Sequence, residues 1–242
     1  MRLAKLKLRD FRNCRKIDAA FEPGFHVLLG GNAQGKTNLL EAVYLLATLR
    51  SFRGAGNAQI IRHKQRAFFA GGLALGQAES DIRHYWSPAQ RKLTVNEKPI
   101  RRVADYLGTL RTVVFCAEDA LLVNGPAKAR RRFLDLLLTQ TQPGYLGLLH
   151  RYTGALRSRN ALLRRDSPDL ALLNSFTREL VANGEKLIVA RRDLVKKLSP
   201  LIRLGYRKIA AKPEDAGIAY APSVREDFAV DLAKSRVREQ RH

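Results

Sequence analysis

Cysteine is nearly absent from this sequence. The two cysteines, Cys14 and Cys116, stand far apart and have no Cys or His companion at the spacing of metal ligands. Two cysteines are too few for a disulfide framework, and their isolation argues against a structural zinc site. The five histidines are equally dispersed and form no ligand pattern.

Long hydrophobic runs are missing as well. No stretch approaches the roughly 18 consecutive apolar residues that a membrane span needs. The first eight residues, Met1 to Leu8, alternate apolar and basic side chains and lack the continuous apolar stretch of a signal peptide. We therefore expect a reduced, cytoplasmic protein with no membrane association.

Acidic residues are in short supply. The 242 residues contain 22 Asp and Glu against 44 Lys and Arg, a formal net charge of +22. Such an excess favours a polyanionic partner, nucleic acid above all, although charges scattered for solubility would give the same total. Hydrophobic residues make up 45% of the chain, which is enough to build a substantial core.

The first half of the chain carries patterns of strands around one helix. The run Phe25 to Leu29 is apolar except for His26, which suits a central strand, and the segment from Lys36 to about Arg50 has helical spacing of its apolar residues. Further short strands are expected at residues 3–8, between 66 and 100, and at Thr112–Phe115.

Beyond Gly125-Pro126 the sequence changes character. Residues from about 127 to 200 are rich in Leu, Arg and Ala and sparing in Gly and Pro, which predicts three or four helical segments ending at Pro200. Residues 216–220 hint at one more strand, and a charged helix is expected from Arg225 to the end.

A phosphate-binding loop is the most specific motif. The pattern G-x-x-x-x-G-K-[ST] is matched by Gly30, Gly31, Asn32, Ala33, Gln34, Gly35, Lys36 and Thr37. Glycines let the backbone wrap a phosphate, and the following helix directs its positive end at the same group. Lys36 is expected to reach the β- and γ-phosphates of ATP, and the Thr37 hydroxyl to bind Mg²⁺. The apolar run before the loop and the helix after it argue against a chance match.

The catalytic acids are not identified by the sequence. Hydrolysis needs carboxylates that hold Mg²⁺ and activate water, and Glu118 and Asp119 are the only candidates of suitable placement. Cys116 and Ala117 separate them from the preceding apolar run. The same two acids also suit the first turn of a short helix, where they complement its dipole.

Several further segments resemble the bacterial RecF DNA replication and repair proteins, whose heads are similar to those of SMC and ABC ATPases. Ala33, Cys14 and Cys116-Ala117 depart from the usual family residues without removing a phosphate ligand. The resemblance rests on the loop and on the segments Leu6–Asn13, Asn38–Ala42, Ser51-Phe52-Arg53, Val114-Phe115 with Glu118-Asp119, Arg130–Asp135 and Ser158-Arg159-Asn160.

The resemblance implies an α/β fold, a P-loop NTPase head of ABC/SMC type with an inserted α-helical lobe. The head would occupy residues 1–126, the lobe 127–204 and a return segment 205–242. In the family, the signature motif and the acidic metal-binding strand come after a helix like the one expected from Arg225 to His242. The resemblance therefore implies an incomplete head here. We expect the chain to bind ATP without hydrolysing it, and to be poorly soluble.

It further implies an ATP-binding protein with an ATP-dependent homodimer, acting on single-stranded and gapped DNA. RecO- and RecR-type mediators would be its partners in recombinase loading, replication recovery and SOS induction after DNA damage. Arg12 would lie near the nucleotide, or be an ordinary surface arginine. Arg130, Arg131 and Arg132 suit DNA phosphates, because the guanidinium fork matches phosphate geometry, or they form a solvated helix face.

Two other interpretations remain open at this point. A small P-loop kinase or GTPase would share the loop, but it predicts a compact parallel sheet alternating with helices. A non-hydrolysing DNA-binding fragment would keep the loop as a remnant. A measurement of DNA affinity with and without ATP distinguishes the RecF-type interpretation from the DNA-binding fragment with a remnant loop.

Overall fold

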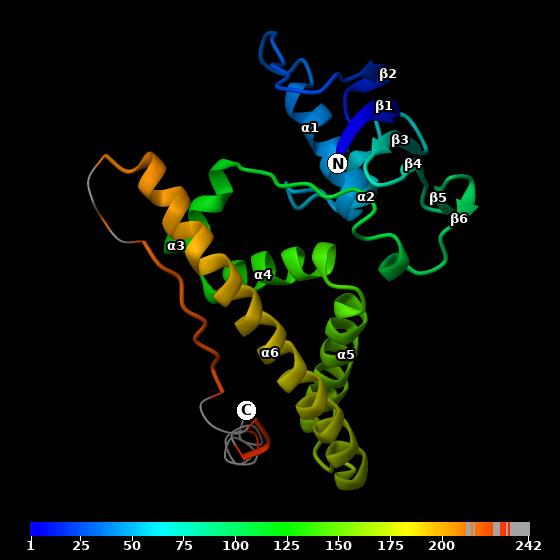
Figure 1. Cartoon of the computed structure of the whole chain (residues 1–242). Helices are drawn as coiled ribbons and strands as arrows, with labels where there is room; N and C mark the ends of the chain where they lie inside the picture. Colours follow the sequence, from blue (N-terminus) through cyan, green and yellow to red (C-terminus); the bar gives the residue numbers. More distant parts are fainter. Residues whose placement is uncertain (212–213, 215, 225–227, 231, 233–242) are drawn as a thin grey trace. The chain divides into compact units, whose positions relative to one another are not determined.

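The computed structural model describes the chain except for residues 212–213, 215, 225–227, 231 and 233–242 (Figure 1). It divides into two units, Met1–Asn124 and Gly125–His242, each of which has its own internal packing. The finer division into residues 1–126, 127–204 and 205–242 stays a prediction.

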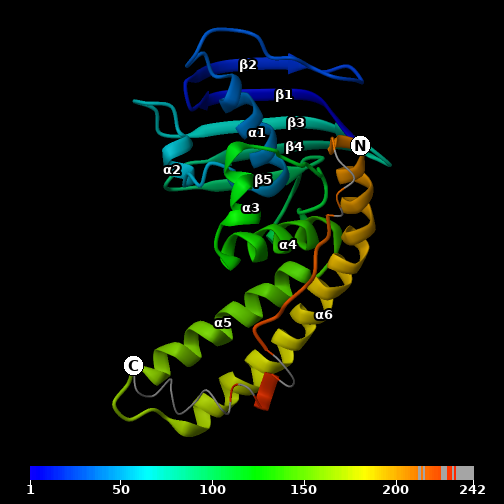
Figure 2. The same cartoon turned by 90° about the vertical axis from the view of Figure 1, so that its left-hand side faces the viewer.

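Unit 1 is built on an antiparallel sheet. Six strands are hydrogen-bonded in the order β2-β1-β3-β4-β5-β6, and Figure 2 shows the first five of them side by side. Their bounds are β1 Arg2–Phe11, β2 Cys14–Ala20, β3 Phe68–Leu75, β4 Glu79–Trp86, β5 Arg91–Val95 and β6 Lys98–Pro99. The strands predicted at 3–8 and between 66 and 100 are confirmed, whereas β2 was missed.

The period-two alternation of β1 explains where the core of unit 1 lies. Leu6 and Leu8 are fully buried, while Lys5 and Lys7 on the opposite face are exposed. Helix α1, Lys36–Thr48, covers the apolar face and places Leu45 and Leu46 in the same core (Figure 2). The sheet thus has a buried face against α1 and a second face outside this core.

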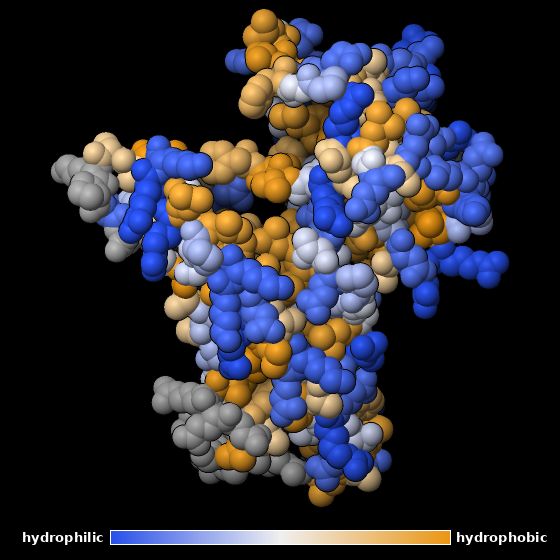
Figure 3. All heavy atoms as spheres, in the orientation of Figure 1, coloured by the Kyte–Doolittle hydropathy of each residue, from blue (hydrophilic) through white to orange (hydrophobic). Residues whose placement is uncertain are grey.

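Two predicted strands are wrong. Residues 25–29 and 112–115 have no strand structure. The side chains of Phe25, Val27 and Phe115 are 103%, 78% and 94% exposed. An apolar run meets the side-chain requirement of a strand, but a strand also needs a partner for its backbone groups. Among the described residues no strand pairs with either segment. Figure 3 shows hydrophobic residues at the tip of the loop that follows β2.

The rest of unit 1 consists of short elements. Helix α2 spans Asn57–Ile60 and α3 spans Leu121–Asn124, and two 3-10 turns occupy Val103–Asp105 and Ala117–Ala120. Tyr106, which follows the first of these turns, is buried, and its hydroxyl donates to the carbonyl of Leu46 in α1. This hydrogen bond fixes the segment after β6 against the core.

Unit 2 is helical, as predicted. It contains α4 Ala127–Thr141, α5 Tyr145–Leu163 and α6 Leu170–Ile209. The prediction that the helical region ends at Pro200 is wrong, because α6 continues through this residue to Ile209. Proline removes one backbone donor from a helix. Pro200 and Lys196, whose carbonyl loses that donor, are both exposed, so water can satisfy the carbonyl.

A polar cluster ties the three helices of unit 2 together. Asp135 of α4 forms two hydrogen bonds with Arg191 of α6, at 2.9 and 3.0 Å. The hydroxyl of Tyr145, at the start of α5, donates to the same carboxylate at 2.5 Å. Burial and the neighbouring Asp135 raise the pKa of Tyr145 well above its ordinary value, so it stays a donor.

The end of the chain gives little support to the predicted elements. Residues 216–220 have no strand structure, so that prediction is wrong. Most of the predicted helix from Arg225 onward lies outside the described residues. Across the described part of the chain, no helix combines the length and the apolar character that crossing a membrane requires.

Candidate nucleotide site

The phosphate loop has the backbone geometry that its glycines predict. Gly30 and Gly35 have φ angles of +148° and +99°, a region that residues with a Cβ rarely adopt. Ala33 also lies in the left-handed region, at φ 63°. This conformation costs a residue with a side chain about 1–2 kcal/mol, so the alanine makes the loop more strained than glycine would.

Lys36 and Thr37 open helix α1 directly after the loop. The Lys36 ammonium donates to the carbonyls of Gly30 and Gly31, at 2.7 and 2.6 Å, so its charge lies over the loop. The first N–H groups of a helix lack partners within the helix, and its dipole is positive at this end. Thr37 is exposed beside them. Loop, helix end and lysine together fit a bound polyphosphate, with the Thr37 hydroxyl available to Mg²⁺.

Asn13 connects this loop to the strands. Its amide nitrogen donates to the carbonyl of Ala33 at 2.9 Å, and its oxygen accepts a hydrogen bond from Asn38 of α1 at 2.8 Å. Arg53 in turn donates to Asn38 at 3.2 Å. A Cβ on Gly35 would come within 2.8 Å of the Asn13 oxygen, so glycine is needed here for space as well as for its φ angle.

Glu41 holds the segments around the loop together. This α1 carboxylate is fully buried and accepts two hydrogen bonds from Arg12, at 2.9 and 2.6 Å. The Ser51 hydroxyl donates to it as well, and Arg53 lies 3.8 Å away. Burial alone would raise the pKa of Glu41, but the Arg12 and Ser51 hydrogen bonds and both guanidinium charges outweigh it and hold the pKa below its ordinary value.

An open, basic cleft lies beside the loop. It has a volume of about 700 Å³, and its lining includes Asn13 and Asn38, which also belong to the hydrogen-bond chain to Ala33. The full lining is Arg12, Asn13, Asn38, Arg53, Gln59, Ile61, Arg62, His63 and Lys64. Of these residues the sequence assigned a role only to Arg12.

The position of Arg12 is set by hydrogen bonds within the protein. Its guanidinium is shared between Glu41 and the carbonyl of Gln59, to which it donates at 2.8 Å. It lines the cleft, but its strongest interactions are with the protein itself. A direct interaction with nucleotide stays a prediction. The sequence signal for this arrangement was the pair of family-like segments Phe11-Arg12-Asn13 and Ser51-Phe52-Arg53. Both contribute side chains that contact Glu41.

The acidic pair occupies a helix start. Glu118 and Asp119 lie in the 3-10 turn before α3, and the Asp119 carboxylate accepts a hydrogen bond from the backbone N–H of Cys116 at 2.8 Å. This geometry fits the helix-terminus interpretation, and a catalytic role stays a prediction. The described residues contain no cluster of three or more His, Cys, Asp or Glu side chains that could hold a metal ion.

The three consecutive arginines belong to unit 2. Arg130, Arg131 and Arg132 are exposed near the start of α4. Arg130 donates to the carbonyl of Gly125 at 2.8 Å. Their guanidinium groups are accessible to an anionic partner, and binding of DNA by them stays a prediction.

Comparison with known proteins identifies the family. No family model matches the sequence. The DNA replication and repair protein RecF of Symbiobacterium thermophilum is 36% identical over 245 residues, which is 100% of this chain and 65% of that protein. The chain belongs to the RecF family. It spans 60% to 65% of the length of the curated relatives it matches.

Solved structures agree with the RecF assignment. Two structures of the recombination mediator protein RecF in the RecFOR pathway, RecF-ATPrS and RecF-ATP, have TM-scores of 0.90 and 0.89 with this chain. They are 28% and 27% identical, and the match covers 99% of this chain and 69% and 68% of theirs. The predicted fold class, an α/β head of ABC/SMC type with a helical lobe, is confirmed.

Proposed function

We propose that this chain is an ATP-binding part of a RecF-type DNA replication and repair protein. The observation that carries the proposal is the complete phosphate loop, with Lys36 folded over it and Asn13 holding its Ala33 carbonyl. A related protein solved as RecF-ATP shares the fold over nearly the whole chain.

The nucleotide would lie across the loop and the cleft. Its phosphates would be held by the loop N–H groups, the start of α1 and Lys36, and Mg²⁺ by Thr37. A Mg²⁺ ion held there would supply positive charge that neutralises the phosphates. The nucleoside part would extend into the basic cleft, where Arg12, Arg53 and His63 offer charge and hydrogen bonds.

DNA would be the second partner. The net charge of +22 supports a polyanion, and single-stranded and gapped DNA are the forms that a RecF-type protein is expected to bind. Mediators of the RecO and RecR type, ATP-dependent homodimer formation, recombinase loading and SOS induction in the cytoplasm complete the proposal. The relatives' names, which give DNA replication, repair and recombination mediation, support it.

The decisive experiment measures DNA affinity with and without ATP. Fluorescence anisotropy of a labelled gapped duplex would be recorded with purified chain, Mg²⁺, and either ATP or no nucleotide. Sedimentation of the same samples would report dimer formation. We expect ATP to raise DNA affinity or the sedimenting mass in the parent, and neither in Lys36→Ala.

The alternatives give different results. A DNA-binding fragment with a remnant loop would bind DNA identically with and without ATP in both proteins. A kinase or GTPase of small substrates would bind nucleotide but show no salt-sensitive binding of DNA. Either result would contradict the proposed function.

A further inference from the structure

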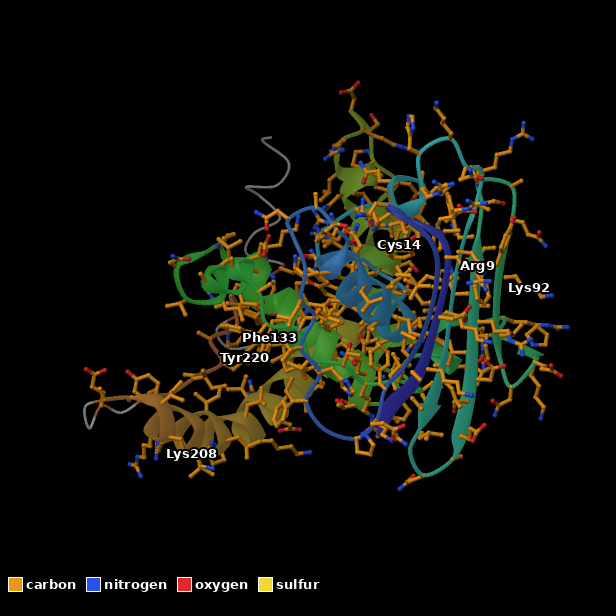
Figure 4. All side chains as sticks on the ribbon, turned by 90° about the horizontal axis from the view of Figure 1, so that it is seen from above. Arg9, Cys14, Lys92, Phe133, Lys208 and Tyr220 are labelled. Atoms are coloured by element: carbon orange, nitrogen blue, oxygen red, sulfur yellow. The ribbon has the colours of Figure 1, made fainter. Side chains whose placement is uncertain are left out.

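The sheet of unit 1 carries a row of basic and aromatic residues on the face outside the core. Cross-strand register places Lys16 of β2 opposite Arg9 of β1, and Arg9 opposite Phe69 of β3. Phe69 is opposite Tyr85 of β4, and Tyr85 opposite Lys92 of β5. Directly opposed residues share one face of an antiparallel sheet. Figure 4 shows Arg9 and Lys92 on the side of the sheet that faces away from α1.

The neighbouring row continues the same face. Lys7 is opposite Gly71, Gly71 opposite Arg83, and Arg83 opposite Thr94. Between the two rows lies a shallow depression of about 270 Å³, lined by Phe69, Arg83, Tyr85, Lys92, Thr94 and Glu97. We call the residues Arg9, Lys16, Phe69, Arg83, Tyr85 and Lys92 the basic aromatic face.

The Phe69 ring lies along its strand. A Cβ on Gly71 would come within 2.7 Å of the outer carbon of this ring, so the ring leans over the glycine backbone. Both Phe69 and Tyr85 keep part of their surface exposed. Aromatic rings on the solvent side of a sheet bury little apolar area against the protein, and they offer flat surfaces to a flat ligand.

The charges on this face are arranged around the rings. Arg9 pairs with Asp18 at 3.2 Å, and Arg83 pairs with Asp81 at 2.6 Å and with Glu97 at 3.8 Å. These are exposed pairs, so both guanidinium groups can exchange a carboxylate for a phosphate. Lys16 and Lys92, at the two ends of the row, are exposed. Five adjacent strands spaced by about 4.8 Å make this row roughly 19 Å long, enough for several nucleotides.

We propose that the basic aromatic face is a binding site for single-stranded DNA. Unpaired bases would stack on Phe69 and Tyr85, and the flanking lysines and arginines would bind the phosphates. Adjacent strands with exposed aromatics and a positive surround form a stacking platform for single strands. Bases in a duplex are already stacked on one another, so the rings discriminate against it. This inference rests on the proposed function, because it names the DNA surface of the same protein.

The test replaces the rings without changing charge. Phe69→Leu combined with Tyr85→Leu keeps apolar side chains of similar bulk, and Tyr206→Leu, at a partly exposed tyrosine of α6, is the matched control. Affinity for a labelled 20-nucleotide oligothymidylate would be measured by anisotropy over a salt series. We expect about tenfold weaker binding for each ring removed, since stacking contributes about that much per base. The salt slope and the affinity for a duplex should not change.

Direct stacking has its own signal. Phe69→Trp would place an indole where bases stack, and its fluorescence should be quenched by the oligothymidylate. The natural Trp86, on the other face and stacked on Phe68, reports the background in the parent chain. A quench in Phe69→Trp with none in the parent supports the site, and equal responses would overturn it.

The outcomes separate this inference from the proposed function. If the parent binds no DNA at all, the proposed function fails. If the parent binds DNA and the double leucine variant binds single strands equally well, only the basic aromatic face is wrong. An equal loss of duplex affinity in that variant would also overturn stacking, and would indicate an apolar surface for another protein or a folding defect, which urea unfolding would reveal.

Discussion

Replacing Arg12 by methionine would leave the Glu41 carboxylate buried without its main partner. Methionine keeps the apolar stem of the arginine and removes its charge and both hydrogen bonds to Glu41. Breaking a buried ion pair from one side costs about 3–5 kcal/mol. Ser51 still donates to this carboxylate and Arg53 stays within 3.8 Å, so we expect the lower end, about 3 kcal/mol.

The pH dependence of this loss gives a second signature. In the parent the pKa of Glu41 is below its ordinary value, so the ion pair contributes stability above the unfolded-state pKa and loses it as pH falls through the folded one. In Arg12→Met only burial and the remaining donors act, and the pKa of Glu41 should rise. The difference between parent and variant should therefore shrink in acid.

Urea unfolding at about pH 7 and about pH 4.5, followed by Trp86 fluorescence, measures both effects. Trp86 is the only tryptophan of the chain and lies in unit 1, which also contains Glu41. Adding Glu41→Gln to Arg12→Met should recover about 1–2 kcal/mol, because the uncompensated charge is removed. A loss below about 1 kcal/mol for Arg12→Met, with no recovery in the double variant, would refute the structural role of this pair.

Three further predictions concern other residues. His84 is fully buried, and no described residue hydrogen-bonds its ring; burial, with a smaller effect of the Arg91 charge, lowers its pKa from 6.5 to about 4. As pH falls, the histidine is protonated in the unfolded chain before it is protonated in the folded one, so about 3 kcal/mol of stability should be lost between about pH 6.5 and 4. Urea titrations of His84→Leu should show little of this pH dependence. Gly35→Ala should weaken ATP binding at least about tenfold by calorimetry, through its φ angle and its closeness to Asn13, whereas Gly31→Ala, whose nearest neighbour would be 3.8 Å away, should change it little. Substituting alanine for Arg130, Arg131 and Arg132 should lower the slope of log DNA affinity against log salt by about 0.7–0.9 for each DNA phosphate that these arginines neutralise, and an unchanged slope would place the DNA elsewhere.

Local patterns were sufficient for the loop, α1 and most strands. The phosphate loop and the helix after it are defined by consecutive residues, and β4 by a partial alternation of polar and apolar side chains, so the sequence predicts them. The apolar run at residues 25–29 satisfies the same rules but has no strand structure, because strand pairing depends on residues elsewhere. At Pro200 the local rule predicts the end of a helix, but α6 continues through this residue.

The site itself depends on interactions that no local rule contains. Arg12 and Glu41 are 29 positions apart in the sequence. Nothing in the residues next to either one distinguishes it from an ordinary charged surface residue. The fold brings them together, and with them Ser51 and Arg53. The row from Lys16 to Lys92 is likewise visible only once the register of five strands is known.

Calorimetric titration of MgATP into the purified chain measures directly whether the phosphate loop binds nucleotide. The ammonium of Lys36 lies over the loop, and a charged hydrogen bond to phosphate contributes about 1.5–3 kcal/mol. We expect saturable binding of one ATP per chain, weakened about tenfold to a hundredfold in Lys36→Ala, with the far-UV circular dichroism unchanged. Equal ATP affinity in the two proteins at matched Mg²⁺, or no binding to the folded parent, would contradict it.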